Sequence, residues 1–413
     1  MYSLLFTISF SILLYLAWGA LYQFVFALAG IFYQNGPKTP LIPSFQGDKK
    51  PFIRVFIPAY REDTVILHTA AAALQQHYPA ARFEVVVVAD GLQAATLATL
   101  NASTVRVVEV QFEKSTKAKA LNQALRCLDG RSGEPVPDIA VVLDADNVMQ
   151  PNFLARVAAH FATGTKALQG RRAAKNGQTN LAVLDAASED VNNHILCRGH
   201  RVLGLSARLA GSGMAFDYAL FATVMPLVDA VGGFDKELEL RLTQQGVCIE
   251  YDEKAVIWDE KVSQSQAFST QRSRWIAAQF RYAKRFLPAG FAQLVRRGNV
   301  DFFNKTLQMT LPPRLLSPGL LALGTLATAI FDASWTAAWA AALVLNLAAF
   351  ALALPSHFYR PRQLRALASL PLAFFSTLRA LTGLREANQV FIVTPKMMVT
   401  EPIASRPFLP KNG

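Results

Sequence analysis

The chain has apolar segments at both ends and a more polar middle. No charged residue occurs between Met1 and Pro37, and the stretch from Leu4 to Phe32 is almost entirely aliphatic or aromatic. About 20 such residues suffice for a helix to cross a bilayer. A secretory signal normally starts with basic residues and has a shorter apolar core. We therefore expect a transmembrane anchor over residues 1–34.

A second apolar region predicts a helical hairpin over residues 315–354. Leu315–Phe331 and Ala333–Leu354 carry no charge, and Asp332 separates them. Basic residues flank the pair, and such residues mark the cytosolic side of a membrane. The flanking residues are Arg314, Arg360, Arg362 and Arg365. Both ends of the hairpin are then cytosolic and the anchor runs inward. This predicts an integral membrane protein whose middle region faces the cytosol, at the plasma or inner membrane if it is bacterial.

Two further stretches suit the membrane surface. Residues 266–314 interleave apolar residues with arginine and lysine, which is typical of interfacial helices, although solvated helices of a soluble domain remain an alternative. In residues 355–413, Ala366–Leu378 is apolar but contains Pro371 and is too short to span a bilayer. We expect an interfacial helix there, followed by a C-terminal tail.

Residues 52–265 alternate short β-branched runs with helical patterns, which predicts an α/β domain with a mostly parallel sheet. The expected strands are Arg54–Pro58, Glu84–Ala89, Val105–Val110 and Ile139–Leu143. The expected helices are Thr64–Gln76, Leu92–Leu100 and Lys117–Leu128, and Pro151 is placed to start another. In such a sheet, ligands bind at the carboxyl ends of the strands.

Composition agrees with a protein that is partly membrane-embedded. Of the 413 residues 52% are hydrophobic and only 17% are charged, and the formal net charge is +12. A basic chain can bind nucleic acid, but much of this charge lies beside the apolar segments, where it suits anionic lipid heads. On the N-terminal side these basic residues are Lys38, Lys49, Lys50 and Arg54. We therefore expect membrane lipids, and no nucleic acid, as partners. Cys127, Cys197 and Cys248 show no disulfide or metal spacing, which fits a reducing compartment.

Polar residues follow the first two predicted strands. The first ends in Pro58-Ala59-Tyr60-Arg61-Glu62, a turn where backbone groups and an acidic side chain can hold a nucleotide. The second ends in Asp90-Gly91. Asp90 could accept from the imide N–H of uracil, or it could cap the next helix. Lys117, at the start of a predicted helix, can meet a diphosphate together with backbone N–H groups.

The fourth predicted strand ends in Asp144-Ala145-Asp146, a DxD pattern. If the chain turns there, one carboxylate can reach the ribose or sugar while the other binds a divalent cation. Mg²⁺ and Mn²⁺ prefer such oxygen ligands together with phosphate. This places a candidate metal site at the sheet edge.

Three later motifs complete the candidate site. Gly211-Ser212-Gly213 is a small-residue loop that an acceptor could approach closely. Asp235 stands where a helix N-cap would be, but an acid near a diphosphate can also be a catalytic base. Gln271, Arg274 and Trp275 form a QxxRW pattern, which puts an amide, a guanidinium and an indole on one helix face.

Taken in order, these motifs resemble those of glycosyltransferase family 2, in particular its membrane-anchored, synthase-like members with a GT-A fold. The resemblance covers about residues 52–280 and extends to the tail motif 391–396. It implies metal binding by Asp146 with Asp144, and an acceptor site shaped by Gly211–Gly213. Nucleotide-sugar contacts are implied for Pro58, Ala59, Tyr60, Glu62, Asp90, Lys117 and Asp144. Gln271, Arg274 and Trp275 would border the acceptor and the diphosphate.

One departure leaves the catalytic base open. Family members usually carry Glu-Asp before the helix that reads x-Leu-Arg-Leu, whereas this chain has Phe234-Asp235. The base is then Asp235, or Glu237 if the alignment contains a gap.

The resemblance implies an inverting, metal-dependent transfer from a nucleotide sugar, with UDP expected and GDP as an alternative, to a lipid-linked or polysaccharide acceptor. A subunit of a processive polysaccharide synthase, with partner subunits for export, is another interpretation. Two further interpretations are a non-catalytic membrane scaffold derived from the same fold and a nucleotidyltransferase.

Overall fold

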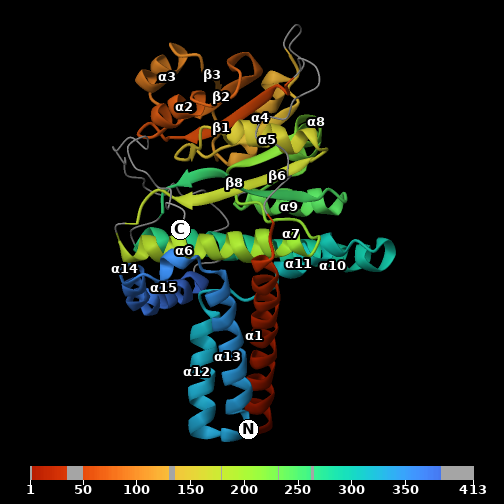
Figure 1. Ribbon diagram of the computed structural model, residues 1–413, viewed down its shortest axis with the longest axis vertical. Helices are drawn as coiled ribbons and strands as arrows, with labels where there is room; N and C mark the ends of the chain where they lie inside the picture. Colours follow the sequence, from red (N-terminus) through yellow and green to blue (C-terminus); the bar gives the residue numbers. More distant parts are fainter. Residues whose placement is uncertain are drawn as a thin grey trace.

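The computed structural model describes residues 2–34, 50–129, 135–177, 179–230, 232–261 and 265–382. An α/β domain lies at one end, three long helices lie at the other, and a layer of helices separates them (Figure 1). Lys38, Lys49 and the tail motif 391–396 lie outside the described residues.

The sheet has eight strands in the order β3-β2-β1-β4-β7-β6-β8-β5. Four of them, β1 to β4, are mutually parallel and correspond to the four predicted strands. The remaining strands make the sheet mixed, because β7 runs antiparallel to both β4 and β6. The strands are β1 (Ile53–Tyr60), β2 (Phe83–Asp90), β3 (Arg106–Val110), β4 (Ile139–Val142), β5 (Val148–Met149), β6 (Ala167–Ala174), β7 (Met214–Asp217) and β8 (Ile249–Asp259).

Strands β5 to β8 were not predicted from the sequence, and their structures explain why. β5 and β7 have only two and four residues. β6 carries polar residues in its second half, and its pairing with β8 shifts register at Gly170. Each feature interrupts the period of two on which strand recognition depends.

Helices cover both faces of the sheet. On β1, Phe56 packs into a core with α4, α8 and α9, whereas Val55 and Ile57 pack into a second core with α2 and α5. These helices are α2 (Ile66–Leu74), α3 (Ala94–Asn101), α4 (Lys117–Leu128), α5 (Phe153–Ala162), α8 (Tyr218–Val224) and α9 (Phe234–Gln244). The predicted start at Pro151 is wrong by two residues, because α5 begins at Phe153 after Asn152.

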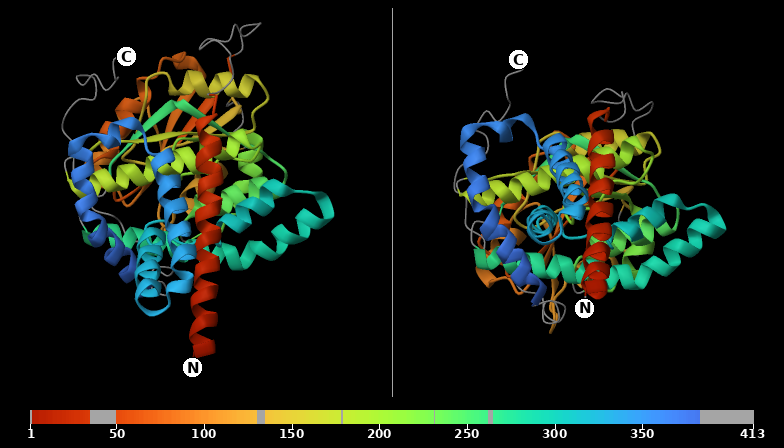
Figure 2. Two further views of the ribbon diagram at one scale, coloured as in Figure 1. Left: turned by 60° about the horizontal axis from the view of Figure 1, so that its bottom comes forward. Right: turned by 90° about the horizontal axis from the view of Figure 1, so that it is seen from below.

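The layer beneath the sheet contains the QxxRW motif. It comprises α6 (Asn180–Asn192), the π-helix η2 (Asn193–Gly199), α7 (His200–Val202), α10 (Ser265–Arg297), α11 (Val300–Gln308), α14 (Pro361–Leu364) and α15 (Leu370–Thr382). Viewed from below, the far ends of α10 and α11 project on one side of the three long helices, and α15 lies on the other (Figure 2). Short 3₁₀ turns join many of these elements.

The three long helices, α1 (Tyr2–Ile31), α12 (Ser317–Phe331) and α13 (Thr336–Ala353), pack against one another. By length and composition, Thr7–Ile31 and Ala333–Ala353 could each cross a membrane. The predicted hairpin is present, with Asp332 in its turn, but α12 has 15 residues and is shorter than a full span.

One basic residue that is expected beside the membrane lies elsewhere. Arg54 is 2% exposed and pairs with Glu84 and Tyr218 inside the α/β domain. It is therefore not placed to meet lipid head groups. Arg314, which flanks the hairpin, lines a cavity between the sheet and the helical layer.

Candidate active site

A cavity of about 490 Å³ lies at the carboxyl ends of the parallel strands, between the sheet and the helical layer. The ends of β1, β2 and β4 line it from above, and residues of α1, α6, α10 and α15 line it from below. This is the edge at which ligands of parallel sheets bind.

The turn after β1 and the end of β2 form one end of the cavity. Pro58, Ala59, Tyr60, Glu62 and Asp90 all line it. Tyr60 and Asp90 occupy matching positions on neighbouring strands. They are thus held side by side by the sheet itself.

Asp90 presents an unused hydrogen-bond acceptor. The residue is 3% exposed, and its Oδ2 has no hydrogen-bond partner among the described residues. It does not cap the next helix, because α3 is preceded by Gln93 and has no side-chain cap. The N-cap interpretation is therefore wrong. A buried carboxylate oxygen without a partner is a candidate to accept a hydrogen bond from a bound ligand.

The DxD turn is held by a buried serine. The backbone N–H of Asp144 donates to Oγ of Ser212 over 2.9 Å, and Ser212 is fully buried. Asp144 and Asp146 both line the cavity. Lys117 forms an ion pair with Asp144, and its Nζ donates to the carbonyl of Gly211 over 2.6 Å. The cation at the start of α4 therefore pairs with the first carboxylate of the DxD motif.

Of the three residues in the glycine loop, only Gly211 is among those that line the cavity. Gly213, at φ +64°, packs against Ile257, and its N–H donates to the carbonyl of Val142 on β4. Ser212 and Gly213 thus lie behind the DxD turn and support it. The expectation that they shape the acceptor site is not met by their positions, since both are shielded from the cavity.

The two candidate bases occupy different environments. Asp235 lines the cavity, and its Oδ2 lies 3.8 Å from the position that a Cβ on Gly211 would take. It belongs to the first turn of α9, and the N-cap is Gly233, at φ +67°. The N-cap interpretation of Asp235 is therefore wrong.

Glu237 lies on the other side of α9. It is fully buried, and its carboxylate pairs with Arg241 at 2.7 Å and with Arg285 at 3.0 Å. It is not among the described residues that line the cavity. Its negative charge is therefore neutralised inside the protein, where α9 meets α10.

The QxxRW residues face the cavity together. Gln271, Arg274 and Trp275 all line it from α10. Oε1 of Gln271 has no hydrogen-bond partner among the described residues. Arg272 stacks on the ring of Trp275, 4.8 Å from its centroid, and pairs with Asp185 at 2.9 Å.

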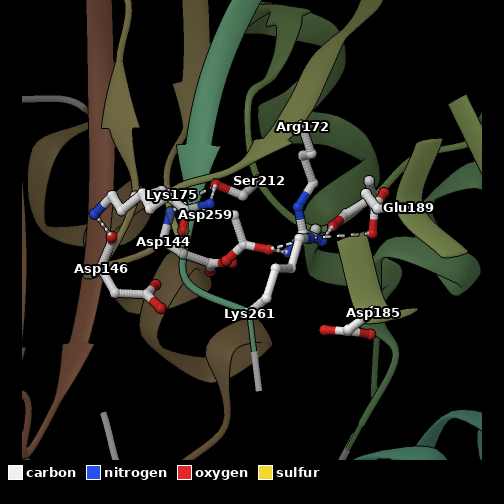
Figure 3. A network of polar contacts seen from close by, with 12 residues as sticks. Asp144, Asp146, Arg172, Lys175, Asp185, Glu189, Ser212, Asp259 and Lys261 are labelled. Carbon is white, nitrogen blue, oxygen red and sulfur yellow. Dashed lines mark hydrogen bonds and ion pairs between the residues drawn. The ribbon is translucent and has the colours of Figure 1, made fainter. Parts of the chain in front are cut away.

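A charged network that the sequence analysis missed forms the cavity floor (Figure 3). Arg172 of β6 and Lys261 both pair with Asp259 at the end of β8, the latter at 2.9 Å. Lys261 also lies 3.7 Å from Glu189 of α6. The signal for Asp259 was present, because a carboxylate ends β8 there, as Asp90 ends β2. No local pattern marks Arg172 or Glu189.

Comparison with known proteins identifies the family of the chain. A sequence profile described as "Glycosyltransferase like family 2" matches residues 51–278, more than half of the chain. The chain belongs to this family. It is a glycosyltransferase, and its reaction is the transfer of a sugar from a nucleotide-sugar donor.

More distant relatives are consistent with this assignment. The glycosyltransferase is 24% identical over 299 residues to "Probable glycosyltransferase YdaM" of Bacillus subtilis (strain 168), covering 71% of each chain. Its fold is similar to that of mannosyltransferase PcManGT from Pyrobaculum calidifontis, solved in complex with GDP-Man and Mn²⁺. That match has a TM-score of 0.50 and 18% identity, and covers 83% of this chain and 97% of the other.

The donor atoms at the DxD turn fit a divalent cation that shares its shell with phosphate. Asp144 and Asp146 supply carboxylate oxygens at the cavity wall. The described residues contain no group of three or more histidine, cysteine or acidic side chains placed to hold a metal. Mg²⁺ typically uses one or two carboxylates and takes its other ligands from water and substrate phosphates. The glycosyltransferase site therefore fits Mg²⁺ or Mn²⁺ held jointly by protein and donor.

Lowering the pH should weaken the charged network at the cavity floor and so destabilise the folded protein. Burial raises the pKa of Glu189, but the charges of Lys261, Arg172 and Arg208 outweigh it and lower that pKa to about 2. A carboxylate whose pKa is lower in the folded state stabilises the protein above its unfolded pKa, and the contribution disappears as pH falls through the folded value. We expect a loss of about 3 kcal/mol between about pH 5 and pH 2, measured as unfolding free energy. Glu189→Gln should flatten this part of the profile. An unchanged slope would contradict the assignment.

Proposed function

We propose that this protein is a membrane-anchored, inverting glycosyltransferase that moves a sugar from a UDP-sugar to a hydroxyl of a lipid-linked or polysaccharide acceptor. One observation carries the proposal. A single cavity is lined by the strand-end carboxylates Asp90, Asp144 and Asp146, by the cation Lys117 and by the candidate base Asp235.

The donor would lie along the sheet edge. Oδ2 of Asp90 would accept from the imide N–H of uracil, beside Tyr60 and the β1 turn. Lys117 would then face the diphosphate, with Arg274 and Gln271 on the opposite wall. When bound, Mg²⁺ or Mn²⁺ would neutralise negative charge on the diphosphate.

The proposed transfer needs one base to take up the acceptor proton and one leaving group to take the electron pair of the broken bond. Asp235 would accept the proton of the acceptor hydroxyl, whose oxygen forms a bond to C1 of the sugar. The bond from C1 to the β-phosphate oxygen breaks on the opposite face, and the nucleoside diphosphate leaves with the electron pair. Lys117 would stabilise the charge that develops on this leaving group.

The outward surface of the three-helix bundle supports a membrane anchor. Large apolar side chains on α1, α12 and α13 are exposed, and continuous apolar surface of this kind is unfavourable in water. They include Ile12, Leu14, Leu28, Leu326, Ile330, Val344 and Leu347. With these helices in lipid, the catalytic domain would face the cytosol, with α10, α11 and α15 at the membrane surface.

The donor and its metal requirement can be tested directly. Membranes that contain the full chain would be incubated with a panel of UDP- and GDP-sugars, with Mg²⁺, Mn²⁺ or EDTA. We expect release of nucleoside diphosphate from one donor, and a loss of about 10²-fold or more in EDTA, because the metal supplies several kcal/mol of charge stabilisation. Asp146→Asn should reproduce this loss, while Asp332→Asn, in the hairpin turn, should keep full activity.

Two results would count against the proposal. Turnover that is indifferent to EDTA would remove the metal role of the DxD turn. Absence of both turnover and donor binding across the panel would contradict the assignment of this cavity as the transferase site. The length of the product separates single transfer from processive synthesis.

A further inference from the structure

The cavity has a second end, away from the strand edge. Tyr22 and Gln23 of α1 line it, together with the loop Leu311–Arg314 that leads into α12, and Thr377 of α15. α1 and the loop are in close contact, since a Cβ on Gly19 would lie 2.7 Å from Cγ of Pro312. The elements that enclose this end therefore continue into the apolar helices.

Cationic side chains gather at this end. Arg208, Lys236, Arg272 and Arg314 all line the cavity. Arg272 is neutralised by Asp185, whereas Arg208 approaches Glu189 only to 3.7 Å and shares it with Lys261. Asp235 and Glu239 lie near Lys236. Of the cations other than Arg314, the one without a close carboxylate of its own among the described residues is therefore Arg208.

Arg314 forms no ion pair with an acidic residue in the part of the chain that the structure describes. Its Nη1 donates to the neutral amide oxygen of Asn192 over 2.6 Å. Burial and then repulsion from Arg208 lower the pKa of Arg314 to about 10. A guanidinium that is enclosed with other cations is stabilised by an anionic ligand, and arginine favours phosphate because its fork binds two oxygens.

A polar side chain on the anchor helix points to the same end. Gln23 is 2% exposed, and its Nε2 donates to the carbonyl of Gly19 over 3.1 Å. Its Oε1 has no hydrogen-bond partner among the described residues. A buried amide on an otherwise apolar helix calls for a partner, and the missing group is a donor such as a hydroxyl.

We propose that this end of the cavity binds the head group of a phospholipid-type acceptor, with Arg314 and Arg208 on its phosphate and Gln23 on a hydroxyl. The acyl chains lie along α1 and the start of α12. This inference rests on the proposed function for the role of the lipid as acceptor, but lipid binding can be measured without turnover. It narrows the acceptor class to lipids that carry both a phosphate and a hydroxyl.

The test uses the full chain in uncharged detergent micelles. Binding of short-chain phosphatidylglycerol would be compared with that of the matching diacylglycerol, which lacks the phosphate, and of glycerol phosphate, which lacks the chains. We expect phosphatidylglycerol to bind about tenfold or more tightly than either, because one charge-assisted contact alone accounts for this factor. Arg314→Gln should remove most of the preference for phosphate and leave nucleotide-sugar binding within about twofold.

Two further variants control for folding and for general charge. Arg314→Lys keeps the cation and should retain part of the preference. Arg360→Gln removes an exposed arginine near the apolar helices and should change nothing. If Arg360→Gln weakens lipid binding as much as Arg314→Gln does, the attraction is a surface effect and the proposal is wrong.

The remaining outcomes are equally decisive. Equal binding of phosphatidylglycerol and diacylglycerol would show that phosphate is not recognised, and tight binding of glycerol phosphate would make the ligand a soluble one. Weaker nucleotide-sugar binding in Arg314→Gln, with lipid binding unchanged, would assign the arginines to the donor diphosphate. Phosphate-dependent lipid binding without turnover of any donor would leave this inference standing and overturn the proposed function.

Discussion

Asp235→Asn is expected to lower the rate of sugar transfer by about 10²–10⁴-fold, the contribution of a positioned general base. Asparagine has the same shape but does not accept the proton of the acceptor hydroxyl. Because Asp235 lines the cavity beside Gly211, whereas the nucleotide end lies at β1 and β2, donor binding should stay nearly unchanged. The measurement is kcat for nucleoside diphosphate release, together with donor affinity from equilibrium binding.

Glu237→Gln is the matched comparison, because it makes the same chemical change two residues further along α9. Glu237 is buried against Arg241 and Arg285, so the variant leaves a largely buried arginine without its partner. We expect a loss of stability of up to about 3 kcal/mol and little change in kcat for the folded fraction. The reverse pattern, with catalysis lost in Glu237→Gln and kept in Asp235→Asn, would make Glu237 the base.

Gly199→Val is expected to detach α1 from the catalytic domain. A Cβ at Gly199 would lie 2.0 Å from the carbonyl oxygen of Phe26, and because this is a backbone atom, rotation of a side chain does not relieve the clash. Next to this contact the ring of Phe26 stacks on His200 at 3.9 Å, and His194 bonds to the carbonyl of Ala27 at 2.8 Å. We expect a loss of about 3 kcal/mol in unfolding free energy.

The backbone at Gly199 does not itself require glycine, since φ is −59°. Any loss therefore reports the steric contact with α1. Gly177→Ala provides the control, because a methyl group there meets no atom within 4 Å. Thermal unfolding in detergent would compare the three proteins. A wild-type melting profile for Gly199→Val would mean that α1 is not held by this contact.

Agreement between sequence and structure was best where local pattern and burial coincide. α4 has the predicted bounds Lys117–Leu128, because its apolar residues recur at helical spacing and Thr116 caps it. Strands β1, β2 and β4 were found because they are nearly continuous buried runs. β3 was found from its β-branched residues, although only one of its five residues is buried. β5 to β8 were missed, because a bulge, short length and polar residues break the period that reveals a strand.

Only some residues of the candidate site were recognised from the sequence. Asp90 ends β2, and Asp144 and Asp146 lie in the turn after β4, so the sheet brings all three to one edge whatever follows in the chain. Arg172 lies on β6, Glu189 on α6 and Arg314 in the loop before α12, and none of them carries a local signal of function. The sequence predicts only that Arg314 marks the cytosolic end of the hairpin, because the residues that follow it are apolar.

The sequence by itself determined the parallel half of the sheet, the apolar helices and the motif order that identifies the family, because each is a property of consecutive residues. Only the tertiary structure decided that Asp235 faces the cavity while Glu237 is neutralised by Arg241 and Arg285, since two residues on one helix differ in which neighbours they meet. It also decided that Gln23 of α1 and Arg314 before α12 share a cavity with the strand ends. Contacts between distant segments depend on how helices pack, and no local period encodes that packing.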